Sequence, residues 1–298
     1  MHPLVRLGQL LRESGYEFTT ITPESHARVN ARRGNERART LRDVFGWSRP
    51  FDRSLLASEM LSLLEKANAI DEDRSKVRYS TDGDFLFVHS AFPTTDSNSV
   101  FFGPDTYRYL KLLRRLKPSA KHAVDVGCGS GAGGIVIAGR CERVILADIN
   151  PLALEYAQVN VELNGIRNAE VIQSDVLQGV EGPIDLVISN PPYLMDTKAR
   201  LYRDGGGRFG EGLSIEIVRQ AVGRAERLIL YTASAIVDGV DTFRAAIDTV
   251  LRPRSSVIGY EELDPVVFGE ELSRDVYSSV DRLAVIALDV SLQSERLL

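Results

Sequence analysis

A proline pair in this chain dictates where one strand must end. The apolar run 184–189 leads directly into Asn190, Pro191, Pro192 and Tyr193. A central strand cannot continue through two prolines, because each lacks an N–H donor and restricts the residue before it. At this point the chain presents the side-chain amide of Asn190, the main-chain carbonyls of Asn190 and Pro191, and the ring of Tyr193. These groups can bind a planar nitrogen that bears N–H donors. Proline pairs after strands are also found in ordinary turns. The interpretation that this segment binds a nitrogen therefore depends on a second motif.

The second motif is a glycine-rich segment that follows the short strand-like run 122–124. It begins at Asp125 and has glycines at positions 127, 129 and 131, with Cys128 between the first two. Alternating glycines let the backbone turn sharply and approach a ligand closely. A carboxylate before the first glycine would repel a pyrophosphate but would hold an ammonium group. We therefore expect a ligand that is cationic at this point, unlike that of the dinucleotide fingerprint.

Two further acids follow strand-like runs downstream. Asp148 ends the buried-strand pattern 143–148, and an acid at the tip of a second strand can accept both hydroxyls of a ribose. Asp175 comes just after the run 169–173, where a carboxylate could accept from an adenine amino group. The three acids together predict a nucleoside ligand with a cationic tail.

In this order the motifs resemble those of the class I methyltransferases that use S-adenosylmethionine (SAM) and carry an Asn-Pro-Pro-Tyr motif. Among these, the chain is similar to the release-factor glutamine methyltransferase family. Residues 100–106 resemble that family's segment before the first core helix, and residues 204–213 resemble its glycine-rich loop. The resemblance implies an α/β fold: a Rossmann-like open twisted sheet of seven strands. It covers about residues 99–298, whereas the first hundred residues match that family poorly.

The resemblance also implies roles for individual residues. Asn190, Pro191 and Tyr193 would bind the methyl acceptor and form the catalytic site. The cofactor SAM would be bound by Thr106, Asp125, Gly127, Cys128, Gly129, Gly131, Asp148, Ile149, Asp175, Val176 and Asn190.

These groups predict SAM-dependent methyl transfer to a planar nitrogen that is oriented by hydrogen bonds to Asn190 and Pro191. Tyr193 would stack on the acceptor and face the sulfonium. The resemblance implies as acceptor a protein glutamine amide, or an amino group of a base or small molecule. Two other functions stay open. An azetidine-2-carboxylate synthase would cyclise SAM itself and release methylthioadenosine, and a non-catalytic module would only bind SAM or RNA.

Composition narrows the class of protein. The chain has 298 residues, 44% of them apolar, which suffices for a large core. No apolar run approaches the length of a membrane span and the start has no secretory pattern, so we expect a cytoplasmic protein with no membrane partner. The cysteines, Cys128 and Cys141, have no metal-ligand spacing, and no metal is predicted.

Three regions are expected along the chain. A small helical N-terminal domain, 1–75, has helices at 3–16, 23–45 and 53–69; a hairpin and linker helix occupy 76–117; and the SAM-binding domain occupies 118–298. The polar residues 93–99 are interpreted as a linker. In the last region strands alternate with helices, which predicts parallel crossovers with ligands at the carboxyl ends of the strands. One helix is expected at 241–251, closed by Pro253.

Basic residues gather near the N-terminus. Residues 1–53 hold ten arginines and six acids, a net charge of +4 in a chain whose total is −5. The segment 28–42 could be a phosphate-binding surface, but a solvated helix face is the favoured interpretation. The pI near 5.6 also favours a protein or small-molecule acceptor over nucleic acid.

Overall fold

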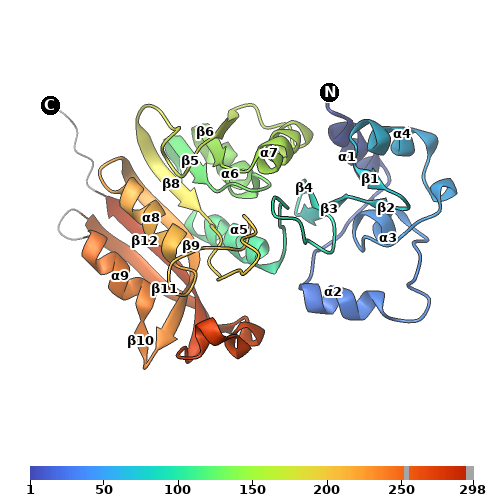
Figure 1. The fold of residues 1–298 in the computed structure, drawn as a ribbon. Helices are drawn as coiled ribbons and strands as arrows, with labels where there is room; N and C mark the ends of the chain where they lie inside the picture. The colour runs from blue at the N-terminus through green and yellow to red at the C-terminus, as the bar shows by residue number, and fades with distance from the viewer. Residues whose placement is uncertain (252–254, 293–298) are drawn as a thin grey trace.

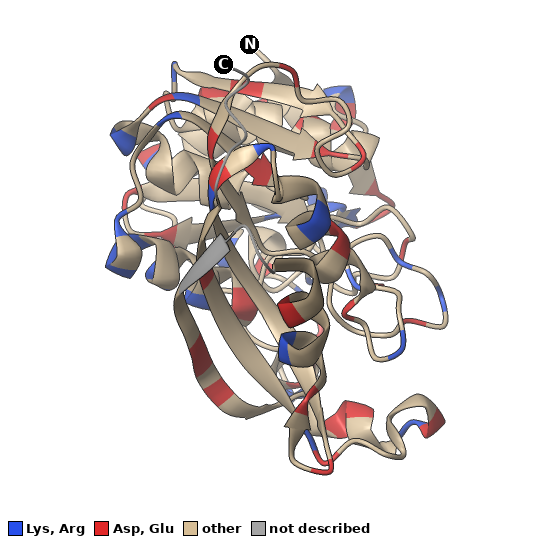
Figure 2. Ribbon diagram, turned by 90° about the vertical axis from the view of Figure 1, so that its left-hand side faces the viewer, with Lys and Arg blue, Asp and Glu red and all other residues tan. Residues whose placement is uncertain are grey.

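The computed structural model describes residues 1–251 and 255–292, so Pro253 lies outside the described residues. Figure 1 shows a lobe of N-terminal helices beside a larger lobe built on a twisted sheet. Figure 2, turned so that the left-hand side of Figure 1 faces the viewer, shows basic and acidic residues interspersed along the chain.

The N-terminal lobe consists of short helices with well-formed starts. The Thr22 hydroxyl accepts from the backbone N–H of Ser25, and Thr40 and Asp43 form a capping box. The expected single helix over 23–45 is wrong: the chain leaves the helix at Ala31 and turns through Gly34, whose φ is +89°. The elements are α1 (Pro3–Glu13), α2 (Pro23–Asn30), α3 (Leu41–Phe45), η1 (Arg53–Leu55), α4 (Ser58–Lys66), β1 (Ile70–Asp71) and β2 (Arg74–Ser75).

The expected hairpin is confirmed as β3 (Val77–Asp82) and β4 (Phe85–Ser90), followed by α5 (Pro104–Leu116). Side chains of α7 (Pro151–Leu163) and of its C-cap complete the free edge of β4. Asn160 accepts from the Val88 N–H at 2.7 Å and donates to the Val88 carbonyl at 3.0 Å. Asn164 bonds Leu86 in the same way. Buried side chains of α1, α4, β3 and α7 form one core, so the two lobes are packed together.

The main sheet confirms the predicted α/β class. Its strands run in the order β11-β12-β9-β8-β5-β6-β7, and the short β10 pairs with β9. One face packs against α5, α6 and α7, and the other against α8 and α9. The strands are β5 (Ala120–Val126), β6 (Cys141–Asp148), β7 (Ala169–Gln173), β8 (Ile184–Ser189), β9 (Ala225–Val237), β10 (Val240–Asp241), β11 (Ser255–Val267) and β12 (Arg282–Leu292). The remaining helices are α6 (Ala132–Ile137), η2 (Ala138–Arg140), α8 (Gly212–Ala221), α9 (Thr242–Leu251), η3 (Gly269–Ser273) and η4 (Asp275–Tyr277).

The expectation of parallel crossovers throughout is wrong at one end of the sheet. Strands β5 to β9 pair in parallel, but β12 runs antiparallel to both β9 and β11. The connection from β11 to β12 contains only the short η3 and η4 turns, and no α-helix to carry the chain across the sheet. The chain therefore turns back beside β11.

Candidate functional site

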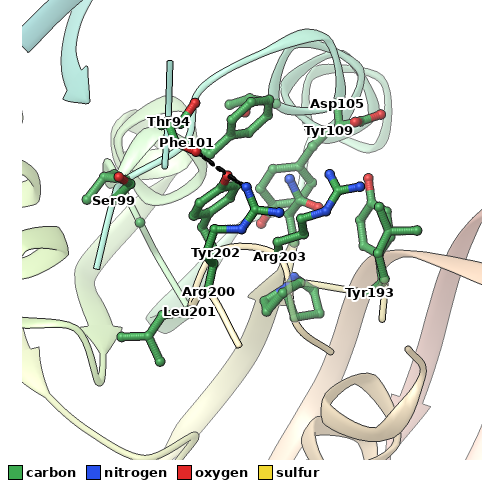
Figure 3. Close-up of a pocket in the computed structure, with 18 of the residues that line it drawn as sticks. Thr94, Ser99, Phe101, Asp105, Tyr109, Tyr193, Arg200, Leu201, Tyr202 and Arg203 are labelled. Atoms are coloured by element: carbon green, nitrogen blue, oxygen red, sulfur yellow. Dashed lines mark hydrogen bonds between the residues drawn. The ribbon is translucent and has the colours of Figure 1, made fainter. Parts of the chain in front are cut away.

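A cavity of about 800 Å³ lies at the carboxyl ends of β5, β6 and β8. Its walls come from four parts of the chain: the start of α2, residues 92–109, the ends of the central strands with the segment after β8, and residues 264–271. Figure 3 shows Asp105, Tyr109 and Tyr193 on one side of it and Arg200, Leu201 and Tyr202 on another. Ligand pockets of open α/β sheets are found at this edge.

The glycine-rich turn after β5 forms the floor of the cavity. Gly127 and Gly129 have φ of +64° and +54°, a conformation that favours glycine. Gly131 is the exception among the predicted cofactor residues, because the structure does not place it at the cavity. A Cβ there would lie 3.0 Å from Leu146 and 3.3 Å from Ala157, so this glycine allows close packing behind the loop.

Asp148 joins the end of β6 to that turn. Its carboxylate accepts from the N–H of Gly129 at 2.8 Å and from the N–H of Asn150 at 2.9 Å. Burial raises the pKa of Asp148, although both backbone donors oppose the rise. The carboxylate lines the cavity and retains lone pairs for further donors such as ribose hydroxyls.

Asp125 is more deeply buried than we expected for a carboxylate that binds the ammonium group of a ligand. It is 2% exposed, accepts from the N–H of Gly134 at 2.8 Å and lies 3.5 Å from the Tyr109 hydroxyl. Burial raises the pKa of Asp125 to about 7. This side chain therefore secures the start of α6 as well as lining the cavity.

Asp125 should give the protein a measurable pH dependence. Its pKa of about 7 lies above the usual 3.8, so the folded state binds an extra proton between these values and stability falls as pH rises through about 7. The uncharged Asp125→Asn should therefore melt several degrees above wild type at about pH 8, and this difference should shrink towards about pH 4. Scanning calorimetry across this range measures it. Asp175→Asn, which removes an exposed carboxylate of the same cavity, is the control, and equal pH trends in the two variants would contradict the assignment.

The motif after β8 contributes an orphaned polar atom. Asn190 Oδ1 is one of two buried side-chain nitrogen or oxygen atoms in the described residues that have no hydrogen-bond partner. The end of β8 is fixed to β5 by the Ser189 hydroxyl, which donates to the Val126 carbonyl at 2.7 Å. Because Asn190 lines the cavity, its oxygen is available to an N–H donor of a ligand.

Tyr193 lies between two other aromatic rings. Its ring centroid is 6.3 Å from that of Tyr231 and 6.1 Å from that of Phe268, and the side chain is 8% exposed. The glycine-rich segment wraps closely around this backbone: a Cβ on Gly210 would lie 2.4 Å from the Tyr193 carbonyl oxygen. The tight wrapping holds Tyr193 in place beside the cavity.

Asp105 is a cavity residue to which the sequence analysis gave no role. The Tyr231 hydroxyl donates to it at 3.2 Å and Arg108 at 3.1 Å. It also contributes to raising the pKa of Tyr193, after the larger effect of burial. Asp105 lies within residues 100–106, the segment that resembles the release-factor family. That resemblance is the signal from which a role for Asp105 could have been predicted.

Residues 94–98, called the roof below, contribute Thr94 and Thr95 to the cavity wall, although the sequence suggested only a linker. The Tyr202 hydroxyl donates to the Thr94 carbonyl at 2.8 Å, and the Leu201 N–H donates to the Ser97 carbonyl at 2.9 Å. On the other side, the Asn150 amide donates to the carbonyl of residue 98 at 2.7 Å. The roof thus connects the ribose-binding end expected at Asp148 with the segment that follows Tyr193.

Ion pairs stabilise the segment that holds the roof. Arg200 forms two bonds of 2.8 Å with Asp196, and this arginine lowers the pKa of the Asp196 carboxyl. Glu271 pairs with both Arg203 and Arg274. These contacts tie the segment after β8 to η3.

The described residues show neither a membrane-spanning helix nor a metal site. None of the helices in 1–251 or 255–292 is long and apolar enough to cross a membrane. Within the same residues, no cluster of histidine, cysteine or acidic side chains could hold a metal ion, and Cys128 and Cys141 are free.

Comparison with known proteins gives the class of the larger lobe. Its residues 109–205 match the family model of the methyltransferase small domain. This part of the chain has the fold of the class I methyltransferases. The release factor glutamine methyltransferase of Deinococcus radiodurans is 33% identical over 150 residues, which are 49% of this chain and 53% of the relative. Ribosomal RNA small subunit methyltransferase C of Escherichia coli is 32% identical over 167 residues, 53% of this chain and 46% of the relative. The chain thus spans about half the length of these curated relatives.

Solved structures agree on this fold. Trm5 of Methanocaldococcus jannaschii in complex with adenosine has a TM-score of 0.52 at 15% identity, with 76% of this chain and 60% of that chain covered. SMU.776 complexed with S-adenosylhomocysteine has a TM-score of 0.52 at 11% identity, with coverage of 78% and 65%. The predictions of a class I methyltransferase fold and of SAM as the cofactor are confirmed.

Proposed function

We propose that the protein transfers the methyl group of SAM to a planar nitrogen. The observation that carries this proposal is the unpartnered, buried oxygen of Asn190 in the wall of the cavity. A buried acceptor without a donor is costly, and it is rarely kept without a ligand that satisfies it. The predicted cytoplasmic location belongs to the same proposal.

The residues of the cavity fit SAM. The carboxylate of Asp148 can accept from the ribose hydroxyls, and the open turn at Gly127 and Gly129 leaves space for the methionine part. Asp175 lies at the cavity edge after β7, where it can accept from the adenine amino group. Bound SAM would supply an electrophilic methyl group on a cationic sulfur.

The acceptor nitrogen would be held by oxygens of the motif after β8. An amide or aromatic amine is a weak nucleophile because its lone pair is delocalised. Hydrogen bonds from its N–H groups to Asn190 Oδ1 and to the Pro191 carbonyl return electron density to the nitrogen and orient it. No general base is needed before the transfer. The N–H proton of the acceptor becomes acidic only after the methyl group has bonded to the nitrogen, and it is lost then.

Tyr193 and Asp105 would define the remaining sides of the acceptor site. The Tyr193 ring is held by its two aromatic neighbours, so it can cover the flat face of the acceptor without losing side-chain entropy on binding. The Asp105 carboxylate is fixed by Tyr231 and Arg108 and lines the same cavity. Both groups favour an acceptor that is neutral or carries N–H donors.

Product analysis tests the proposed reaction. With SAM alone we expect no turnover, and with an RNA, protein or small-molecule fraction of a bacterial extract we expect S-adenosylhomocysteine from one of the three. Asp148→Ala in the same assay reports background turnover. Methylthioadenosine formed from SAM alone would overturn the proposal in favour of SAM cyclisation, and the absence of any product with all fractions would favour a binding module.

A further inference from the structure

Many arginines of the described residues form an ion pair with an acidic side chain. Examples are Arg37 with Asp52 and Asp73, and Arg143 with Glu170. Paired charges of this kind form a neutral surface with little affinity for polyanions.

Three arginines in and just after α2 differ from this pattern. Arg28, Arg32 and Arg33 are exposed, and no ion pair or other partner is found for their side chains in the described part of the chain. Glu24 lies one helical turn before Arg28, yet no ion pair joins the two. Like charges this close in sequence repel one another, so the group is destabilising unless an anion binds to it.

The unpaired arginines lie next to the methyl-transfer cavity. The first residues of α2, Thr22 to Glu24, line the cavity wall, and Arg28 follows Pro23 by five positions. At about 1.5 Å rise per residue, this arginine is roughly 7–8 Å further along the helix. Figure 1 shows α2 at the side of the N-terminal lobe that is turned away from α1 and α4.

A second unpaired basic group is found on the segment after Tyr193. Lys198 and Arg208 are exposed and form no ion pair among the described residues. The same segment supplies Leu201 and Tyr202 to the roof. Unpaired positive charge therefore occurs on two of the elements that form the cavity wall.

We infer that this arginine surface, Arg28, Arg32 and Arg33, binds the phosphate backbone of RNA, and that the methyl acceptor is the amino group of an unpaired base. The inference rests on the proposed function and names its substrate class. Lysine and arginine neutralise phosphates and release counterions, and a base extruded from the strand can enter a cavity of this kind. This inference replaces the favoured interpretation of segment 28–42 as a solvated helix face, because its unpaired arginines lie in and just after a helix that begins at the cavity.

RNA binding by charge-reversal variants tests the inference. The probe is a short, unstructured, fluorescently labelled RNA, and the measurement is anisotropy over a salt series. Arg28→Glu, Arg32→Glu and Arg33→Glu are combined in one variant. Its matched control combines Lys111→Glu, Lys121→Glu and Arg167→Glu, exposed positions that do not line the cavity and give the same change in charge.

We expect the arginine variant to bind the RNA about tenfold more weakly than wild type at moderate salt. The slope of log affinity against log salt should be shallower by about 2, since each single-strand phosphate contact contributes about 0.7. The control should bind like wild type, and both variants should keep wild-type SAM affinity by calorimetry. Equal RNA affinity for the two variants would overturn the inference.

The two proposals can fail separately. If S-adenosylhomocysteine forms only with the protein or small-molecule fraction, methyl transfer to a planar nitrogen stands and the RNA inference falls. If the arginine variant loses RNA binding but wild type gives no S-adenosylhomocysteine with any fraction, the RNA surface stands and the proposed reaction falls.

Discussion

Asn190→Ala should lower the rate of methyl transfer by about 10²-fold or more while leaving SAM affinity nearly unchanged. The reason is that Asn190 Oδ1 is buried in the cavity wall with no protein partner, so only the ligand can use it. An oriented polar contact that forms with the acceptor nitrogen strengthens as positive charge develops there, and its loss appears in kcat. Single-turnover kinetics with the active fraction, together with calorimetry for SAM, measure the two quantities separately.

Asn168→Ala is the matched control for this variant. Asn168 is a part-buried amide that donates to the carbonyls of Ala138 and Cys141, at the opposite end of β6 from the cavity. It should lower stability without changing the rate constant. Asn190→Asp adds a charge near the sulfonium and should tighten SAM binding while slowing transfer. A wild-type rate for Asn190→Ala, or a defect confined to SAM binding, would mean that the motif is a rigid turn.

Asp148→Ala should weaken SAM binding by about 10²- to 10⁴-fold. Two ribose hydroxyls would each lose a charge-assisted bond of about 1.5–3 kcal/mol, and every 1.4 kcal/mol corresponds to a factor of ten. The variant also frees the Gly129 N–H, which Asp148 holds at 2.8 Å, so part of the loss should come from a less ordered glycine turn. Calorimetry with SAM and with S-adenosylhomocysteine measures the change.

Asp185→Ala controls for the loss of a carboxylate that anchors a strand. Asp185 accepts from the N–H of His122 at 2.7 Å, near the amino end of β5 and away from the cavity. We expect it to bind SAM like wild type. If a folded Asp148→Ala also keeps wild-type affinity, Asp148 does not contact the ribose.

The sequence predicted those parts of the site that depend on local backbone chemistry. The proline pair ends β8 where expected, and the glycines at 127 and 129 adopt the positive φ that their spacing suggested. Hydrophobic patterns located the strands but did not report their direction, so the antiparallel β12 was not foreseen. Helix propensity favoured one continuous helix over residues 23–45. In the structure, tertiary packing and the turn at Gly34 divide this segment into α2 and α3.

Contacts between segments that are distant in the chain could not be predicted from the sequence. The Asp105 carboxylate is held by a hydrogen bond from the Tyr231 hydroxyl, which is 126 positions away in the chain. No periodicity in the sequence connects these two residues. The burial of Asp125 depends on Tyr109 and on the start of α6, so its raised pKa was not predictable from its position before the first glycine.

The roof over the cavity is fastened at residues 94, 97 and 98 through main-chain carbonyl oxygens alone. Every amino acid carries such an oxygen, so this segment can change its side chains freely in evolution and still be held closed. The side chains that donate to these oxygens are those of Tyr202, Arg200 and Asn150, which lie far from the roof in sequence. If SAM enters and leaves beneath the roof, the rate of cofactor exchange can be tuned at these positions without altering any residue that contacts the reacting atoms.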